Sequence, residues 1–173
     1  MYVASGHCMK PRMRYRQQNR AAAMLLLLLL FASGTFAASP WGGAKVLKTD
    51  YVPQKVVYDV AVSTEEAFTR LLDRVSYLNN LYHADPFEAS IVVVLHGDEI
   101  PFFAIDSLDR YRHLIQRAQS LTVAGPVEFR MCKVAARAHG YEAGDIHGFV
   151  SMVPMADAEI IRLQQEDGYA CMQ

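Results

Sequence analysis

Strand-like and helix-like patterns alternate along the chain from residue 55 onward, and this alternation constrains the fold more than any other feature. Residues 55–62 form a β-branched run that predicts a first strand. The run 91–95, IVVVL, is apolar on both faces, as a central parallel strand covered by helices on both sides requires. Between them apolar residues recur at helical spacing: Phe68, Leu71, Leu72, Val75 and Leu78.

The alternation continues to residue 172. A second helical stripe is formed by Leu108, Tyr111, Leu114, Ile115 and Ala118. Three further strands are expected at 127–131, 149–153 and 169–172, separated by helices from Lys133 to His139 and from Asp157 to about Leu163. The order β-α-β-α-β-α-β-α-β predicts right-handed crossovers and a mainly parallel five-stranded sheet. The expected fold is therefore a three-layer α/β/α sandwich of flavodoxin-like character.

Helix boundaries are predicted from capping residues. Ser63 is the expected N-cap of the first helix, with Glu66 completing a capping box. The second helix is expected to start at Asp106 or Ser107, and Asp157 is the expected cap of the last one. Gly140 is expected at the C′ position that closes the helix 133–139.

Residues 1–37 have the three-part layout of a secretory signal peptide. Five basic residues and no acidic one precede the apolar segment 21–37, AAAMLLLLLLFASGTFA. Thr35 and Ala37 supply small residues for cleavage after Ala37; the alternative is an uncleaved membrane anchor. We therefore expect a periplasmic or secreted protein that meets the membrane only during export, with an extended leader at 38–54 and one domain at 55–173.

The exported part is acidic. Without residues 1–37 it carries twelve lysines and arginines against 18 acidic residues, a net charge of −6. This balance argues against nucleic acid as a partner, because phosphate backbones require clusters of basic side chains. No cofactor is predicted either: the chain has no G-x-G-x-x-G, P-loop or C-x-x-C motif, and its cysteines and histidines lack metal-ligand spacing.

Chemistry is expected where the strands end, because ligands of open parallel sheets bind outside the carboxyl ends. His96 follows the second strand and Cys132 ends the third, so both should lie at one edge. Cys132 also precedes a helix, whose N-terminal partial positive charge favours a thiolate, and Arg130 and Lys133 are close in sequence. The alternatives are a buried cysteine that only fills space and a histidine bound to backbone.

Five segments in this order resemble the DsrE/DsrF-like superfamily, in particular its branch of small exported proteins. They are KVVYDV, VVVLHGDEIPFF, VEFRMC, DIHGFV and EIIRLQQEDGYA, within about residues 54–173. The resemblance implies a five-stranded parallel sandwich and a homo-oligomer, a trimer or hexamer. It also implies that Cys132 stands where sulfur-relay members carry a persulfide, and that His96-Gly97 matches their histidine-glycine pair. The chain departs from that branch where Lys133-Val134-Ala135 follows the cysteine.

Three hypotheses follow. The first is a periplasmic sulfur carrier or sulfurtransferase-like protein, in which Cys132 accepts sulfane sulfur from a small sulfur compound or a partner protein and His96 assists. The second is a non-enzymatic oligomeric binding module in which Cys132 is structural. The third is a redox protein that uses a Cys132–Cys171 pair.

Overall fold

The computed structural model describes residues 42–173, so the predicted signal peptide lies outside the described residues. The chain divides into two units, Met1–Thr49 and Asp50–Gln173, and the described part of the first, residues 42–49, contains no helix or strand. The strands of the second unit are β1 (Gln54–Val60), β2 (Ala89–Leu95), β3 (Val127–Cys132), β4 (Val150–Val153) and β5 (Ala170–Met172). Its α-helices are α2 (Glu65–Leu81), α3 (Leu108–Ala124), α4 (Lys133–Ala138) and α5 (Ala156–Gln165). Within residues 42–173, none of the helices combines the length and the apolar character that crossing a membrane requires.

All five strands are parallel and form one sheet in the order β4-β3-β2-β1-β5. The predicted parallel α/β sandwich is therefore confirmed. The strand order, which the sequence pattern leaves open, differs from the flavodoxin order 2-1-3-4-5. In the register of the central strands, Val60 lies beside Leu95, and Leu95 lies beside Met131.

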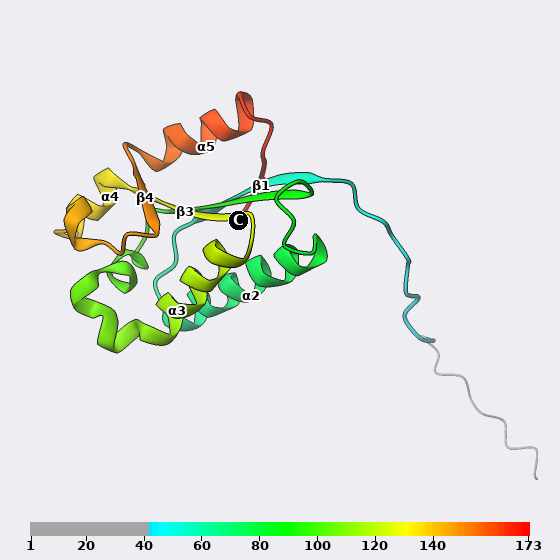
Figure 1. Ribbon diagram of the computed structural model, residues 1–173, viewed down its shortest axis with the longest axis horizontal. Coiled ribbons are helices and arrows are strands. Elements are labelled where there is room, and N and C mark those ends of the chain that lie inside the picture. The colour runs from blue at the N-terminus through cyan, green and yellow to red at the C-terminus, as the bar shows by residue number, and fades with distance from the viewer. Residues whose placement is uncertain (1–41) are drawn as a thin grey trace, which may run out of the picture. The chain divides into compact units, whose positions relative to one another are not determined.

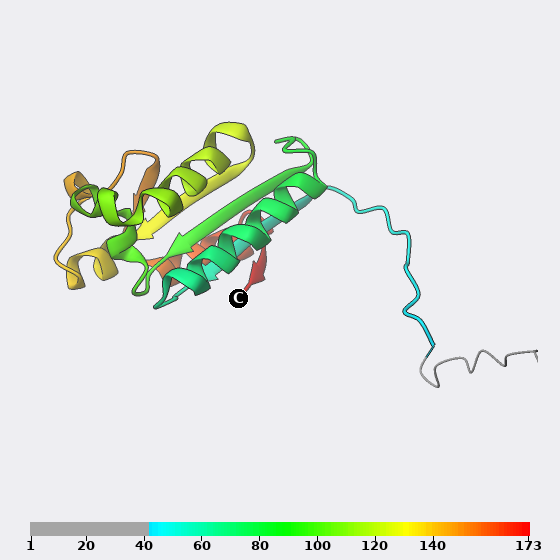
Figure 2. The ribbon, with the colours of Figure 1, turned by 90° about the horizontal axis from the view of Figure 1, so that it is seen from below.

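The helices divide between the two faces of the sheet. Helices α2 and α3 cover one face and α5 covers the other (Figures 1 and 2). Successive residues of β2 serve the two sides in turn: Val93 and Leu95 join the larger core cluster beneath α2 and α3, whereas Val92 and Val94 join a smaller cluster beneath α5. The doubly apolar strand 91–95 therefore lies at the centre of the sheet, as predicted.

Phe102 and Phe103 belong to the larger cluster. They lie on a 3₁₀ turn, Ile100–Phe103, and their side chains are almost fully buried. The ring of Phe103 packs edge-on against Phe68, with centroids 5.4 Å apart, and Phe102 lies 4.6 Å from the ring of Tyr111. Both phenylalanines therefore belong to the core.

Two of the predicted helix caps are wrong. The N-cap of α2 is Thr64 and not Ser63: its backbone is extended, and its hydroxyl accepts a hydrogen bond of 3.1 Å from the Ala67 amide. Two hydroxyl residues stand side by side here, and the apolar stripe is compatible with either start. Helix α5 begins one residue before Asp157, with Met155 as N-cap and no side-chain cap. Ser107 stands at the N-cap of α3 without capping it.

The closing glycine of α4 is confirmed. Gly140 follows the C-cap His139 and has a φ of +85°, a left-handed conformation that costs glycine little.

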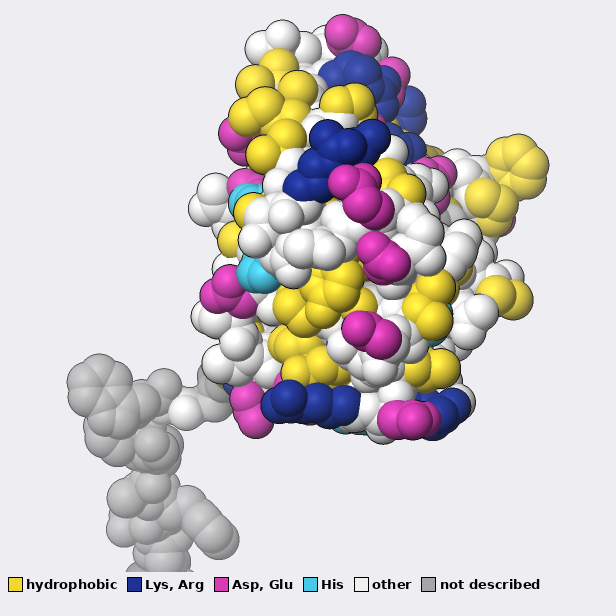
Figure 3. Space-filling view, turned by 90° about the vertical axis from the view of Figure 1, so that its left-hand side faces the viewer, with side chains coloured by type: hydrophobic (Ala, Val, Ile, Leu, Met, Phe, Trp, Pro, Cys, Tyr) yellow, Lys and Arg dark blue, Asp and Glu magenta, His cyan; other side chains and the backbone are white. Residues whose placement is uncertain are grey.

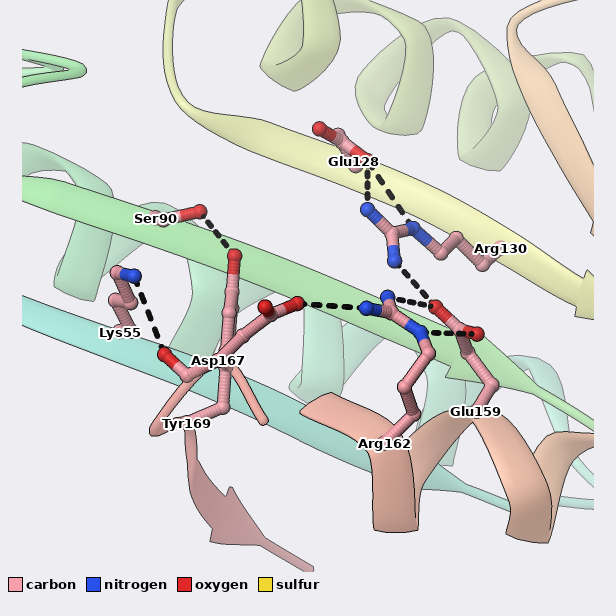
Figure 4. A network of polar contacts seen from close by, with 8 residues as sticks. All are labelled: Lys55, Ser90, Glu128, Arg130, Glu159, Arg162, Asp167 and Tyr169. Atoms are coloured by element: carbon pink, nitrogen blue, oxygen red, sulfur yellow. Dashed lines mark hydrogen bonds and ion pairs between the residues drawn. The ribbon is translucent and has the colours of Figure 1, made fainter. Parts of the chain in front are cut away.

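A chain of ion pairs fixes α5 to the sheet (Figure 4). Arg130 on β3 donates to Glu128 on its own strand and to Glu159 on α5. Glu159 also accepts from Arg162, which reaches Asp167 beyond the helix at 2.8 Å. Because the carboxylate of Glu159 receives two guanidinium groups, the pKa of Glu159 is lowered, chiefly by the hydrogen bond from Arg162.

Candidate functional site at the ends of the strands

The chain leaves β3 and β4 toward opposite faces of the sheet. After β3 it enters α4, whose Ala136 packs into the larger cluster. After β4 it enters α5, whose Ala156, Ile160 and Leu163 cover the smaller cluster. In an open parallel sheet, such a divergence leaves a crevice beyond the carboxyl ends of the two strands.

A shallow depression of about 170 Å³ lies at this point. Its walls come from α4 and from the start of α5, and its lining residues are His96, Cys132, Val134, Ala135, Ala138, Met155, Ala156 and Asp157. Figure 3 views the domain from the side that is on the left in Figure 1; hydrophobic, histidine and acidic side chains are interspersed on it. The structure therefore brings His96 and Cys132, the two predicted site residues, to one depression.

Cys132 ends β3 and is the N-cap residue of α4. Its side chain belongs to the smaller core cluster, and only 5% of the residue is exposed. The thiol therefore forms the buried floor of the depression, beneath a rim that includes the exposed side chains of Val134 and Met155.

The sheet register orients His96 and Cys132. Leu95, the last residue of β2, pairs with Met131, and His96 and Cys132 are the residues that follow this pair in the chain. Leu95 and Met131 point into the larger cluster, and because side chains alternate, the following pair points to the α5 face.

Asp59 on β1 extends this arrangement to a third strand. It follows Val57, which lies in the cluster under α5, by two residues and therefore points to the same face. Its Oδ1 lies 2.6 Å from Nε2 of His96, and both side chains are 26% exposed. Asp59 on β1 thus contacts His96 in the loop after β2, and His96 lines the same depression as Cys132 at the end of β3; we call these three residues the Asp59–His96–Cys132 row.

A second carboxylate lies behind this row. Glu99 is fully buried, and its two oxygens accept backbone N–H groups of Val62 and Gly97, each at 2.9 Å. Burial raises the pKa of the Glu99 carboxyl, and the hydrogen bonds from the backbone amides oppose the rise. The carboxyl group thereby fixes the loop after β1 to the loop after β2, the loop that begins with His96.

Comparison with known proteins identifies the fold. The family model described as DsrE/DsrF-like family matches residues 54–173. The chain belongs to the DsrE/DsrF-like family. A solved structure entitled a protein of unknown function, MTH1491 from Methanobacterium thermoautotrophicum, has 26% sequence identity and a TM-score of 0.53. The match covers 69% of this chain and 97% of that one. Among curated proteins no match was found.

In this DsrE/DsrF-like domain the charge around the thiol differs from the expectation. Arg130 lies on β3 two residues before Cys132, but its guanidinium is bound between Glu128 and Glu159. Its charge is therefore compensated locally. Lys133 is exposed at the start of α4. The depression itself contains one acidic side chain, Asp157.

The second cysteine of the domain, Cys171, lies on β5 beside β1. It is partly buried against the smaller cluster and forms no disulfide. Burial raises the pKa of the Cys171 thiol, and the negative charge of Asp59 raises it further. The pairing proposed in the redox hypothesis is wrong for this fold, because β1 and β2 separate β5 from β3. Three strand spacings of about 4.8 Å each exceed the reach of a disulfide.

Asp145 and His147, which flank the turn at residues 145–148, lie outside this depression. Asp145 accepts a hydrogen bond of 2.8 Å from the Glu142 amide and so stabilises a turn. His147 stacks on Phe149, and its buried Nε2 has no hydrogen-bond partner within the described residues. It lines a different depression of about 420 Å³ between α3 and the start of β4. No group of three potential metal ligands occurs among residues 42–173.

Sequence reasoning missed Asp59 and Glu99. Asp59 interrupts an apolar strand near its carboxyl end, and a charged residue in such a run departs from the pattern of a buried parallel strand. Glu99 follows the His96-Gly97 pair within a loop, where an acidic residue carries no special signal. Only the fold shows that it turns inward.

Proposed function

We propose that this DsrE/DsrF-like protein transfers sulfur, accepting a sulfane sulfur atom on Cys132 as a persulfide. The observation that carries the proposal is the Asp59–His96–Cys132 row at the carboxyl ends of the strands, where a family that includes sulfur-relay proteins has a cysteine. An imidazole beside a thiol is the arrangement that activates a cysteine nucleophile. The apolar rim of Val134 and Met155 suits an uncharged persulfide donor.

The transfer step balances without an external oxidant. The thiolate of Cys132 attacks the outer sulfur of a persulfide donor, R–S–SH; a new S–S bond forms to Cys132 as the S–S bond of the donor breaks, and R–S⁻ leaves. The leaving thiolate takes up the proton that the cysteine released, by way of His96. The products are R–SH and the Cys132 persulfide.

Mass spectrometry of the purified protein tests this proposal. After incubation with a low-molecular-weight persulfide, we expect a gain of about 32 Da, one sulfur atom, located on Cys132 and removed by dithiothreitol. The Cys132→Ser variant should show no gain, whereas Cys171→Ser, which removes the other thiol of the domain, should retain it. An unmodified wild-type protein under donor excess contradicts the proposal.

One observation favours the alternative, a binding module without sulfur chemistry: Cys132 is only 5% exposed and packs among aliphatic side chains. In that case Cys132→Ala would keep both fold and ligand binding, and alkylation of the thiol would require unfolding. The rate of alkylation in the native protein therefore separates the two functions.

We further propose that the protein acts in the periplasm or outside the cell as a homo-oligomer. Support for export comes from the signal-like segment 1–37, and support for assembly comes from the family. Detection of the N-terminus of the protein recovered from cells tests cleavage after Ala37, and light scattering of the purified protein gives the subunit number.

A further inference from the structure

Asp59 and His96 are in direct polar contact near the carboxyl ends of β1 and β2. Asp59 is the one acidic residue of β1, Gln54–Val60, and its Oδ1 is 2.6 Å from Nε2 of His96. Both side chains are partly exposed, so neither needs the other to escape a fully buried state.

A carboxylate at Nε2 decides which nitrogen of a neutral imidazole carries the proton. The carboxylate can only accept, so the proton stays on Nε2 and Nδ1 keeps its lone pair. Since Nε2 is in contact with Asp59, Nδ1 is the ring nitrogen left to accept a proton, and His96 lines the same depression as Cys132.

We propose that Asp59 is the positioning residue that makes His96 the proton acceptor for Cys132. The proton moves from Sγ of Cys132 to Nδ1 of His96, the electron pair stays on sulfur, and the imidazolium is stabilised by the carboxylate of Asp59. The inference rests on the proposed function, because it assigns how that function obtains its nucleophile.

The same carboxylate acts in the opposite sense on the second thiol. Cys171 lies on the strand beside Asp59, and the negative charge of Asp59 disfavours its thiolate. One side chain on β1 thus directs reactivity to Cys132 and away from Cys171. The other charged groups around the row are Asp157 at the start of α5, Lys133 on α4, Arg130 on β3 and the buried Glu99.

Alkylation of both cysteines by iodoacetamide, followed over pH in native protein and located by peptide mass, tests the proposal. In Asp59→Asn, the amide can present its N–H₂ to Nε2 and so reverse the tautomer. We expect the rate at Cys132 to fall at least about tenfold at neutral pH, with its pH profile moved to higher pH. We expect the rate at Cys171 to rise in the same sample.

Slower alkylation at Cys132 together with faster alkylation at Cys171 distinguishes a positioning role of Asp59 from a general loss of structure. A variant that merely loosens the fold would expose both cysteines and accelerate both reactions. Acceleration of both, or a Cys132 profile that Asp59→Asn does not change, would overturn the proposal. So would a wild-type Cys132 that is not alkylated at any pH in the native protein.

Two further variants complete the test. His96→Asn should slow Cys132 as much as Asp59→Asn does, and the double variant should be no slower, because the two residues act as a unit. Asp157→Asn removes a carboxylate from the opposite wall of the depression and should accelerate Cys132, since a like charge near the thiolate is lost. Slowing by Asp157→Asn equal to that by Asp59→Asn would contradict a specific role for Asp59.

The outcome is separable from that of the proposed function. If Asp59 controls alkylation of Cys132 but no sulfur is ever accepted, the positioning role of Asp59 stands and sulfur transfer fails. If sulfur is accepted at equal rates by wild type and Asp59→Asn, sulfur transfer stands and the positioning role fails.

Discussion

Gly97 lies where the loop after β2 comes closest to the loop after β1. A Cβ atom on Gly97 would stand 2.6 Å from the Cα of Ala61 and 2.8 Å from a carboxylate oxygen of Glu99. The neighbours are the backbone of Ala61 and the fully buried side chain of Glu99, and neither can move away without a cost in free energy. The position requires glycine because the two loops approach each other too closely for a Cβ atom, and not because the backbone has a positive φ.

We predict that Gly97→Ala lowers the free energy of unfolding by about 1–3 kcal/mol, the usual cost of overpacking. Gly148→Ala is the matched control, because a Cβ there meets nothing within 4 Å and its φ needs no glycine. That control should change stability by less than about 0.5 kcal/mol. Urea unfolding of both variants measures the difference, and equal effects would contradict the close approach.

Glu99 gives a pH-dependent prediction. Glu99→Gln keeps one oxygen acceptor and turns an amide N–H₂ toward a backbone N–H, so one of its two hydrogen bonds is lost. The loss should cost about 1–3 kcal/mol in acid. Burial raises the pKa of the native carboxyl, so the wild-type contribution falls as pH rises from the unfolded value of about 4.3 through the native one.

The gap between wild type and Glu99→Gln should therefore narrow with increasing pH. Urea unfolding at pH values from about 4 to 8 checks this. A gap that widens over that range would show that the native pKa of Glu99 is lowered.

At the level of elements, α5 is held to the sheet by charge as well as by apolar packing. Glu159 is the centre of this attachment, because it receives both Arg130 from β3 and Arg162 from its own helix. Its side chain is only 12% exposed, which makes the pairs stronger than those on an open surface.

We predict that Glu159→Gln lowers the free energy of unfolding by about 1–3 kcal/mol at neutral pH. Because the native pKa of Glu159 is lowered, its contribution is complete above the unfolded value of about 4.3 and disappears as pH falls through the native value. The difference between wild type and variant should therefore vanish in acid, the reverse of the trend for Glu99.

Asp109→Asn is a suitable control for that measurement. Asp109 pairs with Arg112 on α3, but its side chain is 96% exposed. Exposed pairs contribute little, so this variant should match wild type within about 0.5 kcal/mol at every pH.

At the level of the whole molecule, strand order separates the two cysteines of the described domain. Cys132 ends β3 and Cys171 lies on β5, with β2 and β1 between them. We predict that mild oxidants form no disulfide between Cys132 and Cys171 of one native chain. Each cysteine should remain a free thiol or form a mixed disulfide with a small thiol. Peptide mapping without reductant checks this, and a Cys132–Cys171 linked peptide from native protein would contradict the strand order.

The sequence predicted most of this fold because the determining patterns are local. The stripe from Phe68 to Val75 and the doubly apolar run 91–95 each depend only on near neighbours and on covering layers. Helix starts were harder: Ser63 and Thr64 are chemically similar neighbours, and only the backbone geometry selects Thr64.

The candidate site was predicted in part for the same reason. His96 and Cys132 could be placed at one edge because both follow strands of a parallel sheet. That both side chains point to the α5 face needed the register, and the contact of His96 with Asp59 needed β1 to be the neighbour of β2. The burial of Glu99 could not be predicted, because a loop sequence does not show which carboxylate side chain points into the core.

The cover over the smaller cluster consists of one ten-residue helix, α5. A helix this short can detach for an instant while the rest of the domain stays folded, at a fraction of the global unfolding free energy. Entry of a reagent to the floor of the depression would then follow the amide exchange of that helix rather than that of the central strands. Salt and acid weaken the ion pairs that attach α5 to the sheet. They would therefore increase the exposure of the Cys132 sulfur without acting on the sulfur itself.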